Sequence, residues 1–376
     1  MKSTPSAAVR EHNRSAMTRY LYDRRRATKQ MIAQDLGLSL PTVTRNLRAL
    51  GQEGIAAHGD FMASTGGRKA QAYVFNPRHR VAIGVAMRPN EVDLCAVDLF
   101  GTVIAELHRT LPYRNATAHY QRVGAIVNDF AAGAERTAGP VLGVAFAVQG
   151  IVSPDGQTIV FGNAMGNTGL TLGEISQSVR HPCLMIHRCD ASAMAELWAD
   201  PSLTDAVCLY LDRRPGGAVI IDGRLHQGPA RRNGTIEHMT LVPGGRPCYC
   251  GRLGCMAAYC SPETLTEDYE SIPGFFSVLE QGETGHRQRM GQWLGYVAQT
   301  IVNVRSVIAG DVIVGGEAAH YLDDADIADL KRRIEEHSAF GGEDFTLRTS
   351  RCTDGQDVAG AALCLVRTYL DEICAS

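Results

Sequence analysis

The 376-residue sequence contains no hydrophobic run long enough to cross a membrane. Its longest nearly apolar stretch, residues 141–148, is much shorter than the roughly 20 residues that a membrane-spanning helix needs. No positively charged segment followed by an apolar one opens the chain, so we do not expect a secreted protein. A heptad repeat long enough for a coiled coil is also missing. We therefore expect a cytoplasmic protein whose oligomer contacts lie on its folded body.

The composition is that of an ordinary globular protein, with 45% hydrophobic and 20% charged residues. The length predicts two or three domains. Three of the 11 cysteines fall within eight positions, residues 248–255. Such crowding favours metal ligation in a reducing compartment over a framework of disulfides.

Charge is distributed unevenly along the chain, although the net charge is only −3. Residues 1–80 contain 14 Lys and Arg against 5 Asp and Glu, a net charge of +9, and the remainder carries −12. A basic N-terminal unit joined to an acidic body is typical of a nucleic-acid-binding protein with a separate sensing or catalytic part.

Two short helices around residues 37–39 predict a helix-turn-helix. Thr28 is a candidate N-cap for the first helix, Gly37 a candidate end, and Ser39 a candidate N-cap for the second. The apolar positions of the second helix recur on one face: Val43, Leu47 and Leu50.

The opposite face of that second helix is polar and suits a reader of the DNA major groove. We expect Thr42, Thr44 and Arg45 to reach base edges, and Arg48 to contact phosphate. The alternative is a generic three-helix module with an exposed polar face. The positive charge of the module favours DNA.

Residues 55–58 and 70–75 are candidate strands on either side of a turn, Ser-Thr-Gly-Gly-Arg-Lys, at residues 64–69. This hairpin predicts a winged helix-turn-helix. Arg68 and Lys69 at its tip can enter a narrow minor groove, a preference typical of A·T tracts. The alternative is a solvated basic hairpin tip.

His238, Cys248, Cys250 and Cys255 form the pattern H-x9-C-x-C-x4-C. One imidazole and three thiolates make a closed tetrahedral set, the arrangement of structural zinc without an open position for water. Cys260 is the competing fourth ligand, but its helical spacing is expected to turn it away. We expect a structural Zn²⁺ that shapes a loop.

The run from Gly223 to Tyr259, with its IEHM and CYCGRLGC segments, resembles the ROK family of repressors, open reading frames and sugar kinases. The family's zinc pattern matches the four ligands above one for one. The helix-turn-helix and the STGGRK turn resemble those of the family's transcriptional-regulator branch, similar to repressors of N-acetylglucosamine and glucose uptake. The resemblance implies a two-lobed, actin-like body of the sugar kinase and Hsp70 type, and a homodimer or tetramer.

The order of predicted elements supports this α/β fold independently, because strands alternate with helices in two similar halves. We expect a DNA-binding domain at residues 1–80 and an actin-like body at 81–376. Within the body, residues 81–189 and the final helix, 357–376, form the first lobe. Residues 190–356 form the second lobe with the zinc site.

Both turns that handle ATP phosphates in the family's kinases differ here. The first, residues 84–90, lacks the family's acid and paired glycines, and Pro89 removes an N–H. The second, residues 212–218, carries Arg213 and Arg214 where small residues let the backbone approach a phosphate. Asp190 occupies the position of the family's catalytic base. This base would deprotonate a sugar hydroxyl, but without a positioned γ-phosphate no phosphoryl group can be transferred to that hydroxyl. We therefore expect no enzymatic activity.

The resemblance also locates a sugar pocket, and three of its usual polar contacts are replaced by Cys189, Thr235 and Ala257. A polar group buried without a partner costs about 1–3 kcal/mol, so this pocket suits a different sugar derivative, an oligosaccharide, a non-sugar ligand or no ligand. The remaining candidates for effector binding are Asn163, Asp190 and His238. A second interpretation makes Asp190 a helix N-cap.

The leading hypothesis is a DNA-binding transcriptional regulator, a repressor of carbohydrate-related genes that responds to a carbohydrate-like effector. One alternative is a sugar kinase with an N-terminal regulatory domain, which the two degenerate phosphate turns oppose. The other is a regulator that senses a protein partner, because protein-binding surfaces leave weak signals in one sequence.

Overall fold

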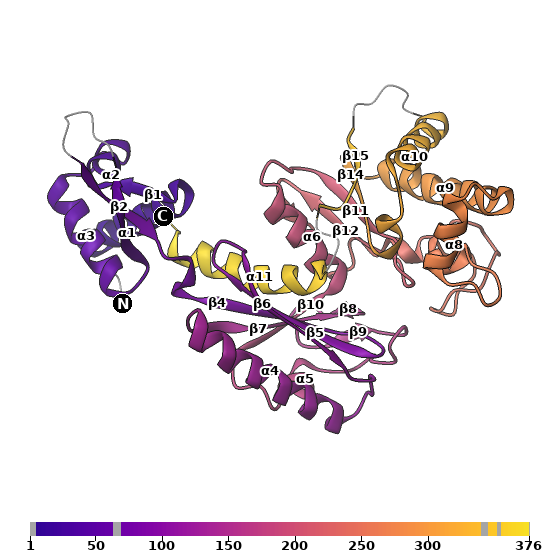
Figure 1. Cartoon of the computed structure of the whole chain (residues 1–376), viewed down its shortest axis with the longest axis horizontal. Helices are drawn as coiled ribbons and strands as arrows, with labels where there is room; N and C mark the ends of the chain where they lie inside the picture. Colours follow the sequence, from indigo (N-terminus) through magenta and orange to yellow (C-terminus); the bar gives the residue numbers. More distant parts are fainter. Residues whose placement is uncertain (1–4, 63–68, 340–344, 352–354, 376) are drawn as a thin grey trace.

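The computed structural model describes residues 5–62, 69–339, 345–351 and 355–375. It has an N-terminal module followed by two lobes, arranged side by side in Figure 1. The elements of the N-terminal module are α1 (Pro5–Arg24), β1 (Arg26–Thr28), α2 (Lys29–Asp35), α3 (Leu40–Gln52), β2 (Ala56–Met62) and β3 (Ala70–Phe75).

Both predicted helix caps are present in the N-terminal module. Thr28 Oγ1 accepts a hydrogen bond from the Met31 amide at 3.3 Å, and Ser39 Oγ accepts one from the Thr42 amide at 3.4 Å. Such a cap stabilises a helix by about 1 kcal/mol. Gly37 follows α2 with φ +63°, a backbone conformation that favours glycine. The predicted helix-turn-helix elements are therefore confirmed as local structure.

The predicted hairpin is also confirmed, and it gains a third strand. The sheet order is β1–β3–β2, with both pairs antiparallel. Strand β1 was not predicted, because three residues are too few for a periodic signal. The hairpin tip lies outside the described residues except for Lys69, so Arg68 is not placed.

The first lobe is built on a five-stranded sheet of order β10–β7–β4–β5–β6. Helix α4 covers one face of this sheet and α11 the other (Figure 1). The elements of this lobe are β4 (Val81–Met87), β5 (Glu91–Asp98), β6 (Val103–Thr110), α4 (Thr117–Thr137), β7 (Val141–Val148), β8 (Ile151–Val152), β9 (Ile159–Phe161), α5 (Leu172–Ser176), β10 (Cys183–His187) and α11 (Gln356–Ile373).

The central strand β4 is buried on both faces, and its two faces differ in side-chain size. Val81, Ile83 and Val85 pack in the core that includes α4. The intervening residues are small and face α11, which comes so close that a Cβ at Gly84 would lie 1.8 Å from the carbonyl oxygen of Val358. The glycine is therefore required by the approach of α11. The expected packing of the final helix on the first lobe is confirmed.

The second lobe contains a five-stranded sheet of order β13–β12–β11–β14–β15. Helices α8, α9 and α10 pack together at its outer end (Figure 1). The elements are α6 (Arg188–Ala199), β11 (Ala206–Tyr210), β12 (Gly216–Ile221), β13 (Arg224–Leu225), α7 (Ala257–Cys260), α8 (Ile272–Glu280), α9 (Thr284–Arg305), β14 (Asp311–Gly315), α10 (Asp324–His337) and β15 (Leu347–Thr349).

The α/β fold with two lobes is confirmed, and each sheet falls within one predicted lobe. The domain limits themselves stay a prediction. Helix α6 begins at Arg188 and not at Asp190, and its N-cap residue is His187. The interpretation of Asp190 as an N-cap is therefore wrong, because this residue lies inside the first helical turn. Helices α8 and α10 were not predicted.

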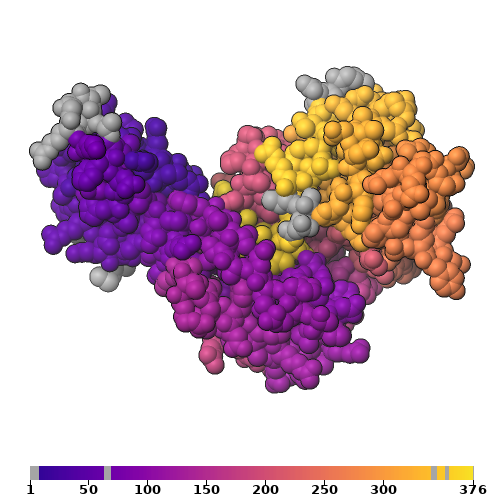
Figure 2. Space-filling view, viewed as in Figure 1, coloured from indigo at the N-terminus to yellow at the C-terminus, as the bar shows by residue number. Residues whose placement is uncertain are grey.

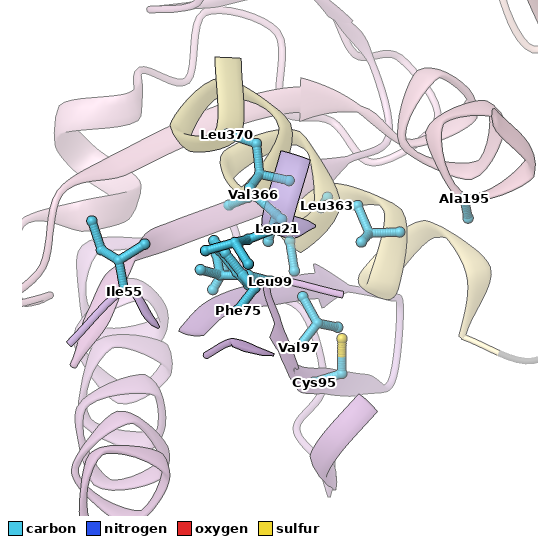
Figure 3. Packing of buried hydrophobic residues seen from close by; sticks show 14 of the residues in the cluster. Leu21, Ile55, Phe75, Cys95, Val97, Leu99, Ala195, Leu363, Val366 and Leu370 are labelled. Atoms are coloured by element: carbon cyan, nitrogen blue, oxygen red, sulfur yellow. The ribbon is translucent and has the colours of Figure 1, made fainter. Parts of the chain in front are cut away.

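The N-terminal module and the first lobe share one hydrophobic core. Leu21 of α1 and Phe75 of β3 belong to the same buried cluster as Leu99, Val366 and Leu370 of the body (Figure 3). In the space-filling view, the indigo module contacts the purple first lobe and lies far from the orange helices (Figure 2). The module is thus held against the body by apolar packing.

None of the helices in the described parts of the chain is long and apolar enough to cross a membrane.

Candidate functional site

The four predicted metal ligands lie together in the second lobe. Their ligand atoms are all within 4.8 Å of one another. His238 ends a 3₁₀ turn (Ile236–His238), and Cys255 lies just before α7. Between the cysteines, Gly251 and Gly254 adopt φ of +88° and +81°, which allows the chain to double back.

The spacing of these atoms fits a tetrahedral zinc ion. The Cys250 and Cys255 sulfurs are 3.7 Å apart, and Cys248 Sγ is 3.8 Å from His238 Nδ1. Thiolates at about 2.3 Å around a tetrahedral centre would be roughly 3.8 Å apart. Burial raises the pKa of Cys255 to about 12, so its thiolate form needs a bound cation. The donor set and the spacing both suit Zn²⁺.

Cys260, the competing ligand, faces away from this cluster. It is fully buried, and its sulfur lies 3.5 Å from the hydroxyl of Thr300 on α9. The expectation that helical spacing turns it away is confirmed.

A narrow pocket lies beside the cluster of His238, Cys248, Cys250 and Cys255, between the two lobes. Asn163 and His238 both line it, together with the aromatic side chains of Phe161 and Tyr249. Its free volume is about 30 Å³. A water molecule needs about 10–15 Å³ by the same measure, so the pocket holds about two waters. A sugar ring can enter only if the walls of the pocket move apart.

Asp190, the third predicted effector residue, does not line this pocket. Its buried carboxylate accepts a hydrogen bond from Gln227 Nε2 at 2.6 Å. Burial raises the pKa of Asp190 to about 6, although the Gln227 amide opposes that rise. The structure thus brings Asn163 and His238 together in the lining of this pocket and leaves Asp190 outside that lining.

Glu237 is a pocket residue that the sequence analysis missed. It is 6% exposed, and its Oε2 has no hydrogen-bond partner among the described residues. Burial raises its pKa to about 7. Its position beside His238 was the available signal, but a carboxylate next to a metal ligand is common in sequences and does not reveal its burial.

The first degenerate phosphate turn is occupied by an arginine. Arg88 follows β4, and its guanidinium pairs with Asp357 at the start of α11 and with Asp93 on β5, each at 2.8 Å. Bidentate pairing of this kind satisfies the donors that an anion would need.

The second degenerate turn is also filled by ion pairs. Asp212 pairs with Arg188 and accepts a hydrogen bond from the Glu317 amide at 2.8 Å. Burial opposes ionisation of Asp212, but Arg188 and that amide outweigh it and lower its pKa. Arg213 lies 3.3 Å from Glu317, and Arg214 lies 3.4 Å from Glu263. A cavity of about 540 Å³ runs along these residues and Arg88.

In the N-terminal module, the polar face of α3 is accessible. Thr44, Arg45 and Arg48 are exposed, whereas Thr42 is half-buried and its hydroxyl lies 2.9 Å from that of Ser39. Neither arginine has a carboxylate partner within the part of the chain that the structure describes. Between α3 and β2 runs a groove of about 590 Å³, lined by Lys29, Thr44, Arg48, His58 and Tyr73 among others.

Comparison with known proteins identifies the class of protein that this fold and metal cluster define. The ROK family pattern matches residues 82–368. The chain belongs to the ROK family. It is 27% identical over 279 residues to the N-acetylglucosamine repressor of Escherichia coli O6:H1. The aligned region covers 73% of this chain and 67% of that relative.

Solved structures show the same fold. A ROK family transcriptional regulator, described as a homologue of the Escherichia coli MLC protein, matches with a TM-score of 0.79 and 16% identity over 98% of both chains. A ROK family glucokinase from Streptomyces griseus, in complex with glucose and AMPPNP, matches with a TM-score of 0.67 and 19% identity. That match covers 77% of this chain and 99% of the glucokinase.

Proposed function

We propose that this protein is a DNA-binding transcriptional regulator that represses carbohydrate-related genes. The observation that carries the proposal is the accessible face of α3, where Arg45 and Arg48 lack carboxylate partners among the described residues, on a module of net charge +9. Arg14, Arg19 and Arg24 of the same module, in contrast, are paired with acids of the chain. Unpaired cations on an exposed helix suit an external polyanion.

The comparisons support this proposal. The related N-acetylglucosamine repressor is named for repression and for a carbohydrate. The regulator structure matches nearly the whole chain, whereas the glucokinase leaves about a quarter of it unmatched. That difference is about as long as the N-terminal module. The ROK family pattern, which begins at residue 82, likewise leaves the module outside its match.

In this function, α3 enters the major groove. Thr42, Thr44 and Arg45 approach base edges, and Arg48 and the groove beside it hold phosphates. Lys69 and Arg68 belong to the hairpin that approaches the minor groove. A homodimer or tetramer presents two copies of α3 to a pseudo-palindromic site.

The body acts as a sensor and not as a kinase in this proposal. At both positions that would hold ATP phosphates, arginines and carboxylates of the chain pair with each other, at Arg88 and at Asp212. A carbohydrate-like effector would bind between the lobes, near Asn163, Glu237 and His238. The four-ligand cluster would hold a structural Zn²⁺, which fixes the loop that carries His238.

Selection of duplexes from random DNA by the full-length protein tests the proposal. The expected result is an enriched pseudo-palindromic sequence that binds in a salt-dependent manner. Deleting residues 1–80 is expected to abolish this binding. Retained binding in the deletion variant would sink the proposal, because the remaining chain carries a net charge of −12.

A further inference from the structure

Helix α6 contacts the turn between β5 and β6 through Trp198 in its last turn. The indole Nε1 donates a hydrogen bond to the carbonyl oxygen of Phe100 at 2.9 Å. The next residue, Gly101, lies directly against the indole, because a Cβ there would be 2.1 Å from Nε1. This glycine has φ +80°. The turn is therefore shaped to receive Trp198 and no larger residue fits at its tip.

The same turn holds the N-terminal module. The hydroxyl of Tyr22 donates a hydrogen bond to the carbonyl oxygen of Leu99 at 3.1 Å. The Phe100 ring lies 5.4 Å from that of Tyr22 and 5.7 Å from that of Phe75. The guanidinium carbon of Arg25 lies 3.5 Å from the centre of the Phe100 ring. The backbone carbonyl of Phe100 thus accepts a hydrogen bond from α6, and the Phe100 ring packs against side chains of the module.

Arg25 occupies the joint between α1 and β1, directly before the two helices of the helix-turn-helix. Its φ of +66° is unusual for a residue with a side chain. A strained backbone of this kind persists only where surrounding contacts hold it, and stacking on Phe100 is such a contact. The orientation of the joint therefore depends on the position of Phe100.

The other end of α6 forms one wall of the pocket between the lobes. His187, Arg188 and Cys189 line that pocket. Arg188 also pairs with Asp212 of the second lobe. The 12 residues of α6 make a rod about 18 Å long, so one rigid helix spans from the pocket to Phe100.

The backbone of helix α6 packs closely against that of α11. A Cβ at Gly360 of α11 would lie 1.7 Å from the carbonyl oxygen of Ala191. Backbones in such contact slide or tilt as rigid bodies and do not deform locally. A shift of the pocket wall at Arg188, in the first turn of α6, is therefore expected to displace Trp198 in its last turn.

We propose that Trp198 and Phe100 couple the pocket between the lobes to the DNA-binding module. Admission of a ligand must widen the pocket, which moves the first turn of α6. Trp198 then displaces the Phe100 turn, and the Arg25 joint reorients α2 and α3. The inference rests on the proposed function and specifies how its two sites communicate.

Thermodynamic reciprocity provides a test that needs no knowledge of the effector, because DNA binding must then alter α6. The probe is the duplex recovered by selection from random DNA, and the measurement is amide hydrogen exchange of the full-length protein with and without it. In the wild type, we expect exchange to change in the module, in the turn containing Phe100 and in α6. In Trp198→Phe, which keeps an aromatic ring but loses the N–H, we expect the change in α6 to be lost.

Trp293→Phe is the matched control, since the chain has two tryptophans. Trp293 is buried in the second lobe, and its Nε1 has no partner among the described residues. In this variant, the duplex should change amide exchange in α6 as it does in the wild type. The fluorescence emission of its single remaining tryptophan, Trp198, should shift when duplex is added.

Two results would overturn the coupling: a wild-type response confined to residues 1–80, or a Trp198→Phe response as large as that of the wild type. The second result would mean that the apolar core shared by the module and the first lobe, and not Trp198, couples DNA binding to α6. Failure to recover any duplex would overturn the proposed function instead.

Discussion

Asp357 and Arg88 form a two-point ion pair between residues that are 269 positions apart in the sequence. The two N–O distances are 2.8 and 3.2 Å, and a third guanidinium nitrogen of Arg88 reaches Asp93. The pair fastens the start of α11 to the end of β4. An incoming phosphate would have to compete with a carboxylate that is already in place, and that carboxylate would repel it.

The first prediction is the absence of phosphoryl transfer from ATP to glucose or N-acetylglucosamine. At both turns the arginines are engaged by carboxylates of the chain, so the γ-phosphate has no preorganised site. A coupled assay should detect no turnover that depends on Asp190. Turnover of about 1 s⁻¹, the low end for kinases, that is lost in Asp190→Asn would show that the chain is an enzyme.

The second prediction concerns the metal cluster. The purified protein should contain about one zinc ion per chain, and Cys250→Ser should lose it and unfold at lower denaturant concentration, because the metal bonds close the loop. Elemental analysis and denaturant titration measure both effects. The control is Cys260→Ser, which should keep its zinc because Cys260 faces Thr300. Equal zinc content in the two variants would contradict the ligand assignment.

The third prediction separates base contacts from phosphate contacts on α3. Arg45→Ala should cost about 1–3 kcal/mol of binding free energy at one base position and relax specificity there. Arg48→Ala should weaken all duplexes alike and reduce the slope of log affinity against log salt by about one. Anisotropy titrations at two salt concentrations across single-base variants of the selected duplex distinguish them. Identical behaviour of the two variants would contradict this division of roles.

The fourth prediction follows from the raised pKa of Asp190. Burial raises this pKa from 3.8 to about 6, so the native state binds a proton more tightly than the unfolded chain does. Wild-type stability is therefore lost as the pH rises through the range from about 4 to 6, relative to a variant that cannot ionise. Asp190→Asn should exceed the wild type in unfolding free energy at pH 7 by up to about 3 kcal/mol.

Denaturant titrations at pH 4 and pH 7 measure that difference, which should fall below about 1 kcal/mol at the lower pH. The exposed Asp268 provides the control, since Asp268→Asn should leave stability unchanged at both values. A constant difference between Asp190→Asn and the wild type at the two values would assign the effect to packing alone.

The fifth prediction tests the close approach of α11 to β4. Gly84→Ala places a methyl group against the Val358 carbonyl and should destabilise the protein by about 1–3 kcal/mol or more. Gly133→Ala is the matched control, near the C-terminal end of α4, where the nearest atom to an added Cβ is a side-chain nitrogen at 3.9 Å. That change should stabilise the protein by about 0.5–1 kcal/mol. Thermal unfolding of both variants measures the contrast.

Features encoded by neighbouring residues were predictable. The caps at Thr28 and Ser39 act within three residues, so local spacing identifies them. The metal ligands span only residues 238–255, and their chemical type restricts what they can bind. The fold class followed from the alternation of strands and helices. The zinc itself, the DNA contacts and the effector stay predictions.

Contacts between distant segments could not be predicted in the same way. Asp190 was expected in the pocket, but the turn of α6 directs its carboxylate to Gln227. Glu237 was overlooked because burial, and not residue type, distinguishes it from an ordinary surface glutamate. Residues 84–90 were interpreted as a degenerate phosphate turn, but the ion pair between Arg88 and Asp357 was not identified.

The sequence by itself determined the helix caps at Thr28 and Ser39, the alternation of strands and helices in the body, the contrast between a basic N-terminal part and an acidic remainder, and which four residues can bind a metal together. These properties depend on periodicity, composition and spacing along the chain. Only the tertiary structure decided that Arg88 meets Asp357 and that Trp198 meets Phe100, 98 positions away. The physical reason is that such pairs are selected by how helices and sheets pack, and packing depends on the shapes of all the surfaces that fold together.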